Sequence, residues 1–215
     1  MLVGVVGFAG SGKGAVSDIF VEMGFTKLAF ADPVKDCVSK IFGWNRASLE
    51  GDTDTSRRFR EIEDPYWGIT PRYALQLMGT EAGRSVFGGD IWIRSMEVRM
   101  KSYHDCVISD VRFPNEMEFI RSNGGNLVTV SRGNLPVWYE TARVENHLQE
   151  NLVEHGNLMS TKYPEIHYSE WAWIGQPVDF MIDNNSDLDT LRNNVIEMTK
   201  SFKGTRRHLP FDKEI

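Results

Sequence analysis

A glycine-rich segment near the N-terminus sets the strongest limit on the fold. Residues 7–14, GFAGSGKG, follow the apolar run at 2–6 and precede apolar residues that recur at helical spacing between 15 and 23. Such neighbours predict a buried strand before the segment and a helix after it. The spacing GxxxxGK favours glycine because backbone N–H groups must turn inward and approach phosphate oxygens closely. The sequence therefore predicts a strand, a phosphate-binding loop and a helix, in that order.

Lys13 is the cation of this predicted loop. It would reach the β- and γ-phosphates of a nucleoside triphosphate, and the N-terminus of the helix would face the same oxygens. The alternative, a glycine-rich turn with an incidental lysine, is disfavoured by the flanking strand and helix. Gly14 stands where a Ser or Thr ligand for Mg²⁺ is usual, so Ser11 and Ser17 are weaker candidates for a hydroxyl ligand. The residues expected to bind the nucleotide are Gly7, Ala9, Gly10, Ser11, Gly12, Lys13, Gly14 and Ala15.

Five short apolar runs alternate with predicted helices along the chain. This alternation implies an α/β fold of three layers, with a mostly parallel five-stranded sheet and helices on both of its faces. The runs lie at residues 2–6, 26–31, 106–109, 127–130 and 178–182. The intervening helices are expected at residues 15–23, 32–43, 70–78, 90–103, 114–122 and 188–198.

Two long stretches and the C-terminus interrupt this pattern. Residues 44–69 are polar and charged and are expected to form a mobile insertion rather than core. Residues 132–176 are rich in His, Glu, Asn and Trp and are expected to be irregular. Both belong to a single expected domain of residues 1–203, and residues 204–215 are expected to be a loosely held tail.

Carboxylates follow two of the predicted strands. Asp110 comes after the third strand and Asp32 after the second. Ligands of parallel sheets bind beyond the carboxyl ends of the strands, so Asp110 is expected to direct Mg²⁺, through water, and Asp32 to face the acceptor phosphate or a metal-bound water. Each could instead cap the helix that follows it. An acceptor hydroxyl would make Asp32 the general base, whereas an acceptor phosphate is already anionic and needs none.

Arginines are the other candidates at this edge of the sheet, because a transferring phosphoryl group needs cations around it. Arg112 lies two residues beyond Asp110, and Arg132 directly follows the fourth strand. Both are expected near the phosphates, although the usual place of an arginine is the solvated surface. Further candidates are Lys35, Arg72, Arg84 and Arg94; Arg84 follows a predicted helix break at residues 79–83.

The composition excludes several partners. A formal net charge of −6 argues against binding to a nucleic acid polymer, which needs a broad positive field. No apolar run is long enough to span a bilayer, and the N-terminus lacks the basic start of a secretory leader. The two cysteines, Cys37 and Cys106, are expected to be buried free thiols. The expected location is the cytoplasm.

Seven segments of the chain resemble the phage deoxynucleoside monophosphate kinase family, a branch of the P-loop kinases. They appear in the order found in that family and cover most of residues 1–200. They are GFAGSGKG, AFADPVKD, LQLMGTEAGR with the following DIWIR, ISDVRFPNE, VTVSR, HYSE and DFMIDNNSDLDTL. The long stretch between Arg132 and His167 departs from many relatives, in which it is shorter.

This resemblance implies a P-loop kinase fold with ATP as donor, Mg²⁺ and a deoxynucleoside monophosphate as acceptor. The family often forms a homodimer, and the expected setting is the host cytoplasm. It places Lys13 and the loop amides on ATP, and Asp110, Arg112 and Arg132 at the transfer. Residues 44–69 would lie on the acceptor side, and residues 132–176 would resemble a lid. The residues it places toward the acceptor are Asp32, Lys35, Arg84, Trp92 and Arg94. Those it places in or near the lid are His167, Ser169 and Glu170.

Two rival functions stay open at this point. A P-loop kinase that phosphorylates a small-molecule hydroxyl, as dephospho-coenzyme A kinase does, would share the same loop. A nucleotide-sensing module would bind ATP without transferring phosphate. The cluster of Lys13, Asp110, Arg112 and Arg132 argues against a module without catalysis.

Overall fold

Two compact units make up the chain, of which the computed structural model describes residues 1–150 and 158–202. The first unit joins Met1–Lys27 to Tyr103–Ile215, and the second is Leu28–Ser102. The expected insertion at residues 44–69 lies wholly within the second unit. The expected tail, residues 204–215, lies outside the described residues.

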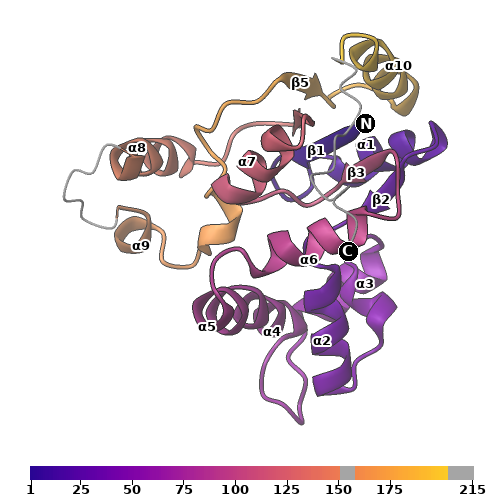
Figure 1. The fold of residues 1–215 in the computed structure, drawn as a ribbon. Coiled ribbons are helices and arrows are strands. Elements are labelled where there is room, and N and C mark those ends of the chain that lie inside the picture. The colour runs from indigo at the N-terminus through magenta and orange to yellow at the C-terminus, as the bar shows by residue number, and fades with distance from the viewer. Residues whose placement is uncertain (151–157, 203–215) are drawn as a thin grey trace. The chain divides into compact units, whose positions relative to one another are not determined.

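A five-stranded sheet organises the first unit (Figure 1). Its order is β2-β3-β1-β4-β5, and the pairs β1–β3, β1–β4 and β4–β5 are parallel. In the register, Val3 of β1 lies opposite Val107 of β3 and Asn126 of β4. The strands are β1 (Leu2–Val6), β2 (Thr26–Leu28), β3 (Cys106–Ile108), β4 (Asn126–Ser131) and β5 (Phe180–Asp183).

Helices cover both faces of this sheet. Val3 and Val5 of β1 pack in one buried cluster with Phe20 of α1 (Lys13–Glu22) and Leu191 of α10 (Leu188–Thr199). Alternate residues of a strand point to opposite faces, so Gly4 faces the other side. There it approaches Ile120 of α7 (Pro114–Ser122) so closely that a Cβ would lie 3.0 Å from that side chain, and Figure 1 shows α7 lying against the strands. The predicted three-layer α/β fold is confirmed.

The stretch predicted to be irregular, residues 132–176, contains helices α8 (Tyr139–Glu150) and α9 (Leu158–Lys162) and the 3₁₀ helix η3 (Tyr168–Glu170). The expectation of an irregular stretch is therefore wrong. The helix α8 is hard to recognise in the sequence because polar side chains occupy its buried face. Glu145 is 3% exposed and accepts a hydrogen bond from Met159 N at 2.5 Å. Asn146 is 6% exposed and donates to the carbonyl oxygens of Trp171 and Ile174. These two residues mask the apolar repeat that marks a helix in a sequence.

The second unit is helical and has a hydrophobic cluster of its own. Val38, Trp44, Leu49 and Ala74 are buried together. Trp44 and Leu49 belong to residues 44–69, so the expectation that this stretch lies outside the core is wrong. Its two buried apolar residues are isolated in a polar sequence and show no helical or strand period. The elements are α2 (Asp32–Phe42), η1 (Arg46–Leu49), α3 (Asp54–Glu61), α4 (Pro71–Gln76), the π-helix η2 (Leu77–Arg84), α5 (Ser85–Phe87) and α6 (Ile91–Met100).

Several smaller expectations also differ from the structure. The second strand ends at Leu28 rather than at residue 31. Residues 79–83 do not break the helix but continue it as the wider π-helix η2. Cys106 is buried and free as expected, whereas Cys37 is free but exposed on α2. Within residues 1–150 and 158–202, none of the helices has the length and apolar character needed to cross a membrane.

Candidate active site

The glycine-rich segment forms a loop between β1 and α1, in the predicted order. β1 ends at Val6, the loop closes with a hydrogen bond from Ser11 N to Phe8 O at 3.1 Å, and α1 begins at Lys13. Gly7 has φ 145°, and a Cβ at this residue would lie 2.5 Å from the carbonyl oxygen of Val130 in β4. Only glycine fits this approach, so the loop starts tightly against the neighbouring strand.

The N-terminus of α1 is suited to an anion. No side chain caps the helix at Gly12, and no acidic residue lies in its first turn. The first amide groups of a helix lack partners within the helix, and its dipole places partial positive charge at this end. A phosphate oxygen is a natural acceptor for such amides.

Lys13 lies over the loop. Its Nζ donates hydrogen bonds to the carbonyl oxygens of Gly7 at 2.7 Å and Phe8 at 2.8 Å. Burial of the ammonium group and, next, the positive charge of Arg112 lower the pKa of Lys13, while Glu170 and Asp110 act in the opposite direction, and the net result is a pKa of about 8. Three of the residues predicted to act in phosphoryl transfer therefore share one electrostatic environment: Lys13, Asp110 and Arg112.

Arg112 is held by acidic and hydroxyl groups of η3. Its Nη1 donates to Glu170 Oε1 at 2.8 Å, and Ser169 Oγ lies at 3.5 Å. Burial opposes the charged form of Arg112, but the adjacent Glu170 carboxylate raises its pKa above the usual value. The residues of HYSE that the resemblance assigns to a lid thus contact a predicted transfer residue.

Glu116, which the sequence alone does not single out, fixes the backbone at Arg112. It is 2% exposed, and its Oε2 accepts hydrogen bonds from Arg112 N at 2.8 Å and Phe113 N at 3.1 Å. A glutamate three residues into a helix commonly bonds amides at the start of that helix. This position, following Phe113-Pro114, is the signal by which Glu116 could be found.

Asp110 and Arg132, the other two predicted transfer residues, differ in their relation to Lys13 and Arg112. Asp110 is partly buried, lies two residues beyond β3 and contributes to the electrostatic environment of Lys13. Arg132 directly follows β4 and is exposed, and no ion pair within the described part of the chain involves it. The catalytic role of Arg132 stays a prediction.

In the described part of the chain, few protein oxygens near the loop could bind Mg²⁺, which fits a metal ion held mostly by water and by substrate phosphates. The hydroxyl of Ser17 is buried and donates its proton to Lys13 O at 2.8 Å, within α1. Ser11 Oγ is buried and has no hydrogen-bond partner among the described residues. No cluster of three or more metal-binding side chains occurs in the described ranges. Mg²⁺ commonly binds through one or two carboxylates, water and substrate phosphates, and Asp110 with Ser11 is compatible with that mode.

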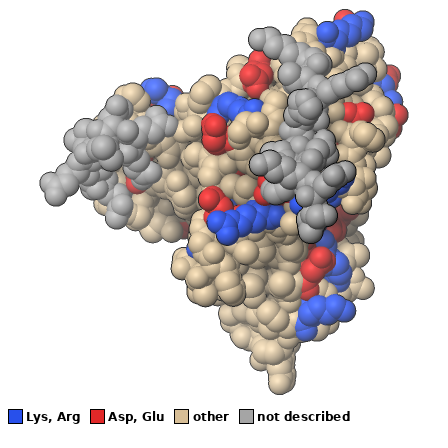
Figure 2. All heavy atoms as spheres, in the orientation of Figure 1, with Lys and Arg blue, Asp and Glu red and all other residues tan. Residues whose placement is uncertain are grey.

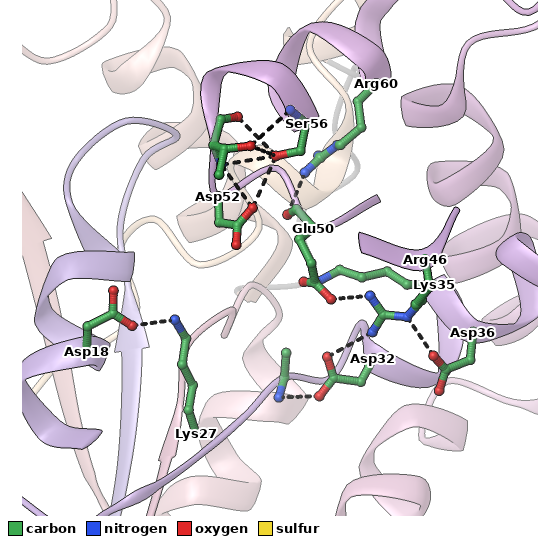
Figure 3. Close-up of polar contacts among 12 residues, drawn as sticks. Asp18, Lys27, Asp32, Lys35, Asp36, Arg46, Glu50, Asp52, Ser56 and Arg60 are labelled. Carbon is green, nitrogen blue, oxygen red and sulfur yellow. Dashed lines mark hydrogen bonds and ion pairs between the residues drawn. The ribbon is translucent and has the colours of Figure 1, made fainter. Parts of the chain in front are cut away.

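In the second unit, Asp32 is engaged in a network of charged groups (Figure 3). Its carboxylate accepts hydrogen bonds from Ala29 N at 2.9 Å and Arg99 Nη1 at 3.0 Å, with Arg46 Nη2 at 3.5 Å. It does not cap α2, since the residue at the cap is Ala31 and no side chain bonds the helix there. The alternative interpretation of Asp32 as a helix cap is wrong.

Lys35 and Arg72 are paired with carboxylates in the same unit. Lys35 Nζ lies 2.5 Å from Glu50 Oε2, and Arg72 is paired with Glu61. Figure 3 shows Arg46 reaching both Asp36 and Glu50. The network residues Arg46, Glu50 and Arg99 carry no sequence signal, because their partners are brought together by folding and lie in no recognisable motif.

Trp92 serves packing in this structure. It is 9% exposed, its Nε1 donates to Gly79 O at 2.7 Å, and a Cβ on Gly83 would lie 2.4 Å from its ring. The ring therefore stabilises the π-helix η2. Arg84 at the end of η2 donates to Gly89 O at 2.8 Å, and Arg94 on α6 is exposed. Contacts of all three residues with an acceptor stay predictions.

Charged side chains of both signs are interspersed over the face drawn in Figure 2. Basic residues there stand beside acidic ones rather than gathering in one broad area. Lys13 and Arg112 are therefore cations in a chain whose formal net charge is −6.

Comparisons with known proteins identify relatives. A deoxynucleotide monophosphate kinase of Acanthamoeba polyphaga mimivirus is 32% identical over 148 residues, covering 61% of this chain and 74% of that protein. The deoxynucleoside-5'-monophosphate kinase of Escherichia phage T5 is 27% identical over an alignment of 179 residues, covering 56% of this chain and 72% of that protein. No family model matches the chain.

Solved structures with a similar arrangement have low sequence identity. TT1252 from Thermus thermophilus has a TM-score of 0.48 at 14% identity and covers 95% of this chain and 98% of that chain. Dephospho-CoA kinase from Campylobacter jejuni has a TM-score of 0.42 at 13% identity, with the same coverage of 95% and 98%. The assignment rests on the sequence relatives, above all on the 32% identity that extends over 74% of the mimivirus protein. The chain belongs to the deoxynucleoside monophosphate kinase family and is a kinase.

Proposed function

We propose that the chain transfers the γ-phosphoryl group of ATP to a deoxynucleoside 5'-monophosphate in the presence of Mg²⁺, giving the diphosphate and ADP. The observation that carries the proposal is the uncapped N-terminus of α1 behind a glycine loop, with Lys13, Asp110 and Arg112 in one electrostatic environment. The names of the two relatives support the acceptor class. Positioning and charge stabilisation are the main catalytic terms in phosphoryl transfer, and this cluster supplies both.

Donor binding begins with the loop amides of residues 7–15 and with Lys13. The ammonium group exchanges its bonds with the carbonyl oxygens of Gly7 and Phe8 for bonds with phosphate oxygens. A charge-assisted bond to phosphate is stronger than a bond to a neutral carbonyl, so the exchange favours the bound state. The charge on Lys13 is then placed where negative charge develops during transfer.

Arg112 would stabilise the transferring group. Its guanidinium group is oriented by Glu170, and Glu116 holds its backbone amide. A planar guanidinium group can donate two parallel hydrogen bonds to phosphate oxygens, which a lysine cannot do. We assign to Glu170 the role of keeping Arg112 charged and directed before the phosphate arrives.

The metal would be held by Asp110 through water, by the phosphates of ATP and by Ser11, whose buried hydroxyl has no partner among the described residues. When bound, Mg²⁺ neutralises charge on the β- and γ-phosphate oxygens. The chain itself supplies a carboxylate and a hydroxyl at the loop and leaves most of the coordination to other oxygens.

The acceptor needs no general base. The phosphate of a nucleoside monophosphate is ionised near neutral pH, so its oxygen attacks without losing a proton. The acceptor-side residues proposed from the resemblance are Asp32, Lys35, Arg84, Trp92 and Arg94, with Arg72 as a further candidate. For Asp32 and Lys35 this requires that their respective partners, Arg99 and Glu50, remain in place or be exchanged for the acceptor.

Steady-state turnover across acceptors tests the proposal. The panel contains dGMP, dTMP, dAMP, dCMP and their ribose counterparts, together with dephospho-coenzyme A as a hydroxyl acceptor, with and without Mg²⁺. We expect ADP and the corresponding diphosphate from at least one deoxynucleoside monophosphate, and loss of both products when the metal is removed. Turnover with the hydroxyl acceptor alone would establish the rival kinase. ATP binding without turnover of any acceptor would establish the sensing module instead.

A further inference from the structure

Asn184, which follows β5, contacts the phosphate-binding loop from across the sequence. It is 9% exposed, and its Nδ2 donates a hydrogen bond to the carbonyl oxygen of Ser11 at 2.9 Å. Its backbone N–H donates to Ser131 O at 2.8 Å, at the end of β4. The residue is thus anchored to the sheet by its backbone while its side chain reaches the loop.

The packing of Asn184 against Gly12 is independent evidence for a close fit. Gly12 has φ 103°, and a Cβ built on it would lie 2.0 Å from Asn184 Nδ2 and 3.1 Å from Asn184 Cγ. The amide group therefore fills the space that glycine leaves free. The hydrogen bond acts on Ser11, and the packing acts on the next residue, Gly12, at the N-cap of α1.

The bond to Ser11 determines how the next peptide group is oriented. A peptide unit is planar and trans, so its C=O and N–H point in opposite directions. Because the carbonyl of Ser11 points to Asn184, the N–H of Gly12 points away from Asn184. The amides that follow, those of Lys13 and Gly14, begin α1 and have no side-chain cap.

We propose that Asn184 is a positioning residue that holds the Ser11–Gly12 peptide in the orientation that presents the Gly12 N–H to the donor phosphates. The inference rests on the proposed function, because it takes the loop to be the site of ATP. Asn184 acts through Ser11 and Gly12 and does not itself contact the reacting atoms. The neighbouring Asn185 extends the link, since its Oδ1 accepts from Gly133 N at 2.8 Å, one residue beyond Arg132.

Substitution of Asn184, with a matched asparagine as control, tests the proposal. Asn184→Ala removes both the bond and the packing, and Asn184→Asp retains the shape but replaces the donor by an acceptor. Asn123→Ala is the control: its Nδ2 also donates to a backbone carbonyl, that of Phe119, at 2.8 Å, at the C-terminal end of α7. The dissociation constant of ATP is measured by calorimetry without acceptor, and turnover is measured with ATP and the acceptor varied in turn.

We expect Asn184→Ala to raise both the dissociation constant and the KM for ATP roughly tenfold, the effect of losing one buried hydrogen bond that orders a binding loop. Asn184→Asp is expected to bind ATP more weakly still, because its charge repels the phosphates. The KM for the acceptor should change less than about twofold in either variant, and Asn123→Ala should leave both constants within about twofold of the parent.

Thermal unfolding and circular dichroism identify which variants are folded. A folded Asn184→Ala or Asn184→Asp protein that binds ATP as tightly as the parent would overturn the inference, as would equal increases in the two KM values. The proposed function fails in a different way, through a parent protein that binds ATP and phosphorylates no nucleoside monophosphate. The calorimetric comparison remains decisive for Asn184 in that case.

Discussion

Lys13 is the residue whose protonation most directly links the structure to the proposed reaction. Its Nζ is bonded to Gly7 O and Phe8 O, and burial, with the nearby charge of Arg112, lowers its pKa from 10.5 to about 8. An ordinary lysine remains charged to well above pH 9, whereas this one loses its charge within the range accessible to assays. Phosphate binding at the loop should therefore depend on pH through this single group.

We expect the dissociation constant of ATP to be constant near neutral pH and to rise above about pH 8, by up to about tenfold per pH unit, because binding then requires uptake of a proton by Lys13. Calorimetry across this range measures the constant. Lys13→Met should bind ATP weakly at every pH, without the rise, and should transfer phosphate at least ~100-fold more slowly. A parent protein whose affinity is flat through pH 9 would contradict the prediction.

The stability of the protein without ATP gives a second readout of the same pKa. Between about pH 8 and pH 10.5 the unfolded chain keeps the proton of Lys13 while the folded chain has released it. The unfolded state then binds more protons, so the contribution of Lys13 to the free energy of unfolding increases with pH in this window. Comparison of the parent with Lys13→Met by denaturant titration isolates the contribution, which should be absent in the variant.

At the scale of elements, α8 shows how a helix can be held by polar groups. Asn146 lies on its buried face and bonds two carbonyl oxygens, those of Trp171 at 3.0 Å and Ile174 at 2.8 Å. Ala142, Met159, Trp171 and Ile174 surround these bonds in a hydrophobic cluster. In such surroundings an unpaired carbonyl has no water to replace its partner.

Asn146→Ala should lower the free energy of unfolding by about 1–3 kcal/mol, because the buried carbonyl of Ile174 loses the bond from Asn146 and that of Trp171 keeps only the bond from Ile174 N. Denaturant titration measures the change, and hydrogen exchange should locate it in residues 139–150 and 168–176. Asn193→Ala on α10 is the control: Asn193 is exposed, and alanine favours a helix, so this variant should be neutral or slightly stabilising. Equal effects of the two substitutions would show that the buried amide of Asn146 contributes nothing.

Some elements can be predicted from the sequence because their signals are local. β1 is a continuous apolar run, and α7 begins at Pro114 and ends at Ser122, as the proline and the following glycines indicate. α8 could not be predicted, because Glu145 and Asn146 stand where a helix normally shows apolar residues. The same limit hides Trp44 and Leu49, which are buried without any period around them.

The same distinction between local and non-local signals applies to the candidate site. The phosphate loop follows β1 directly, and Asp110 and Arg112 lie two and four residues beyond β3, so parallel-sheet topology predicts where they lie. The contacts that orient them are not local: Asn184 is 173 positions from Ser11, and Glu170 is 58 positions from Arg112. Contacts between residues so far apart in the sequence are formed by the fold, and a single sequence contains no pattern that predicts them.

At the scale of the whole molecule, each compact unit has its own hydrophobic core. The cluster that joins Val3, Phe20 and Leu191 belongs to the sheet unit, and the cluster of Val38, Trp44 and Leu49 belongs to residues 28–102. Hydrophobic stabilisation depends on the apolar area that each cluster removes from water. A cavity in one core should therefore first weaken the unit that contains it, provided that the units can open separately.

Leu49→Ala and Leu191→Ala form a reciprocal test of this separation. Leu49 is 0% exposed in the second unit and Leu191 is 2% exposed in the first, so each substitution should cost about 2–5 kcal/mol of local stability through lost burial and a residual cavity. Native-state hydrogen exchange should show loss of protection mainly in residues 28–102 for Leu49→Ala. For Leu191→Ala the loss should be concentrated in the strands and in α1. If either variant lowered protection equally over both units, the chain would unfold as one cooperative structure, and the two cores would not be energetically distinct.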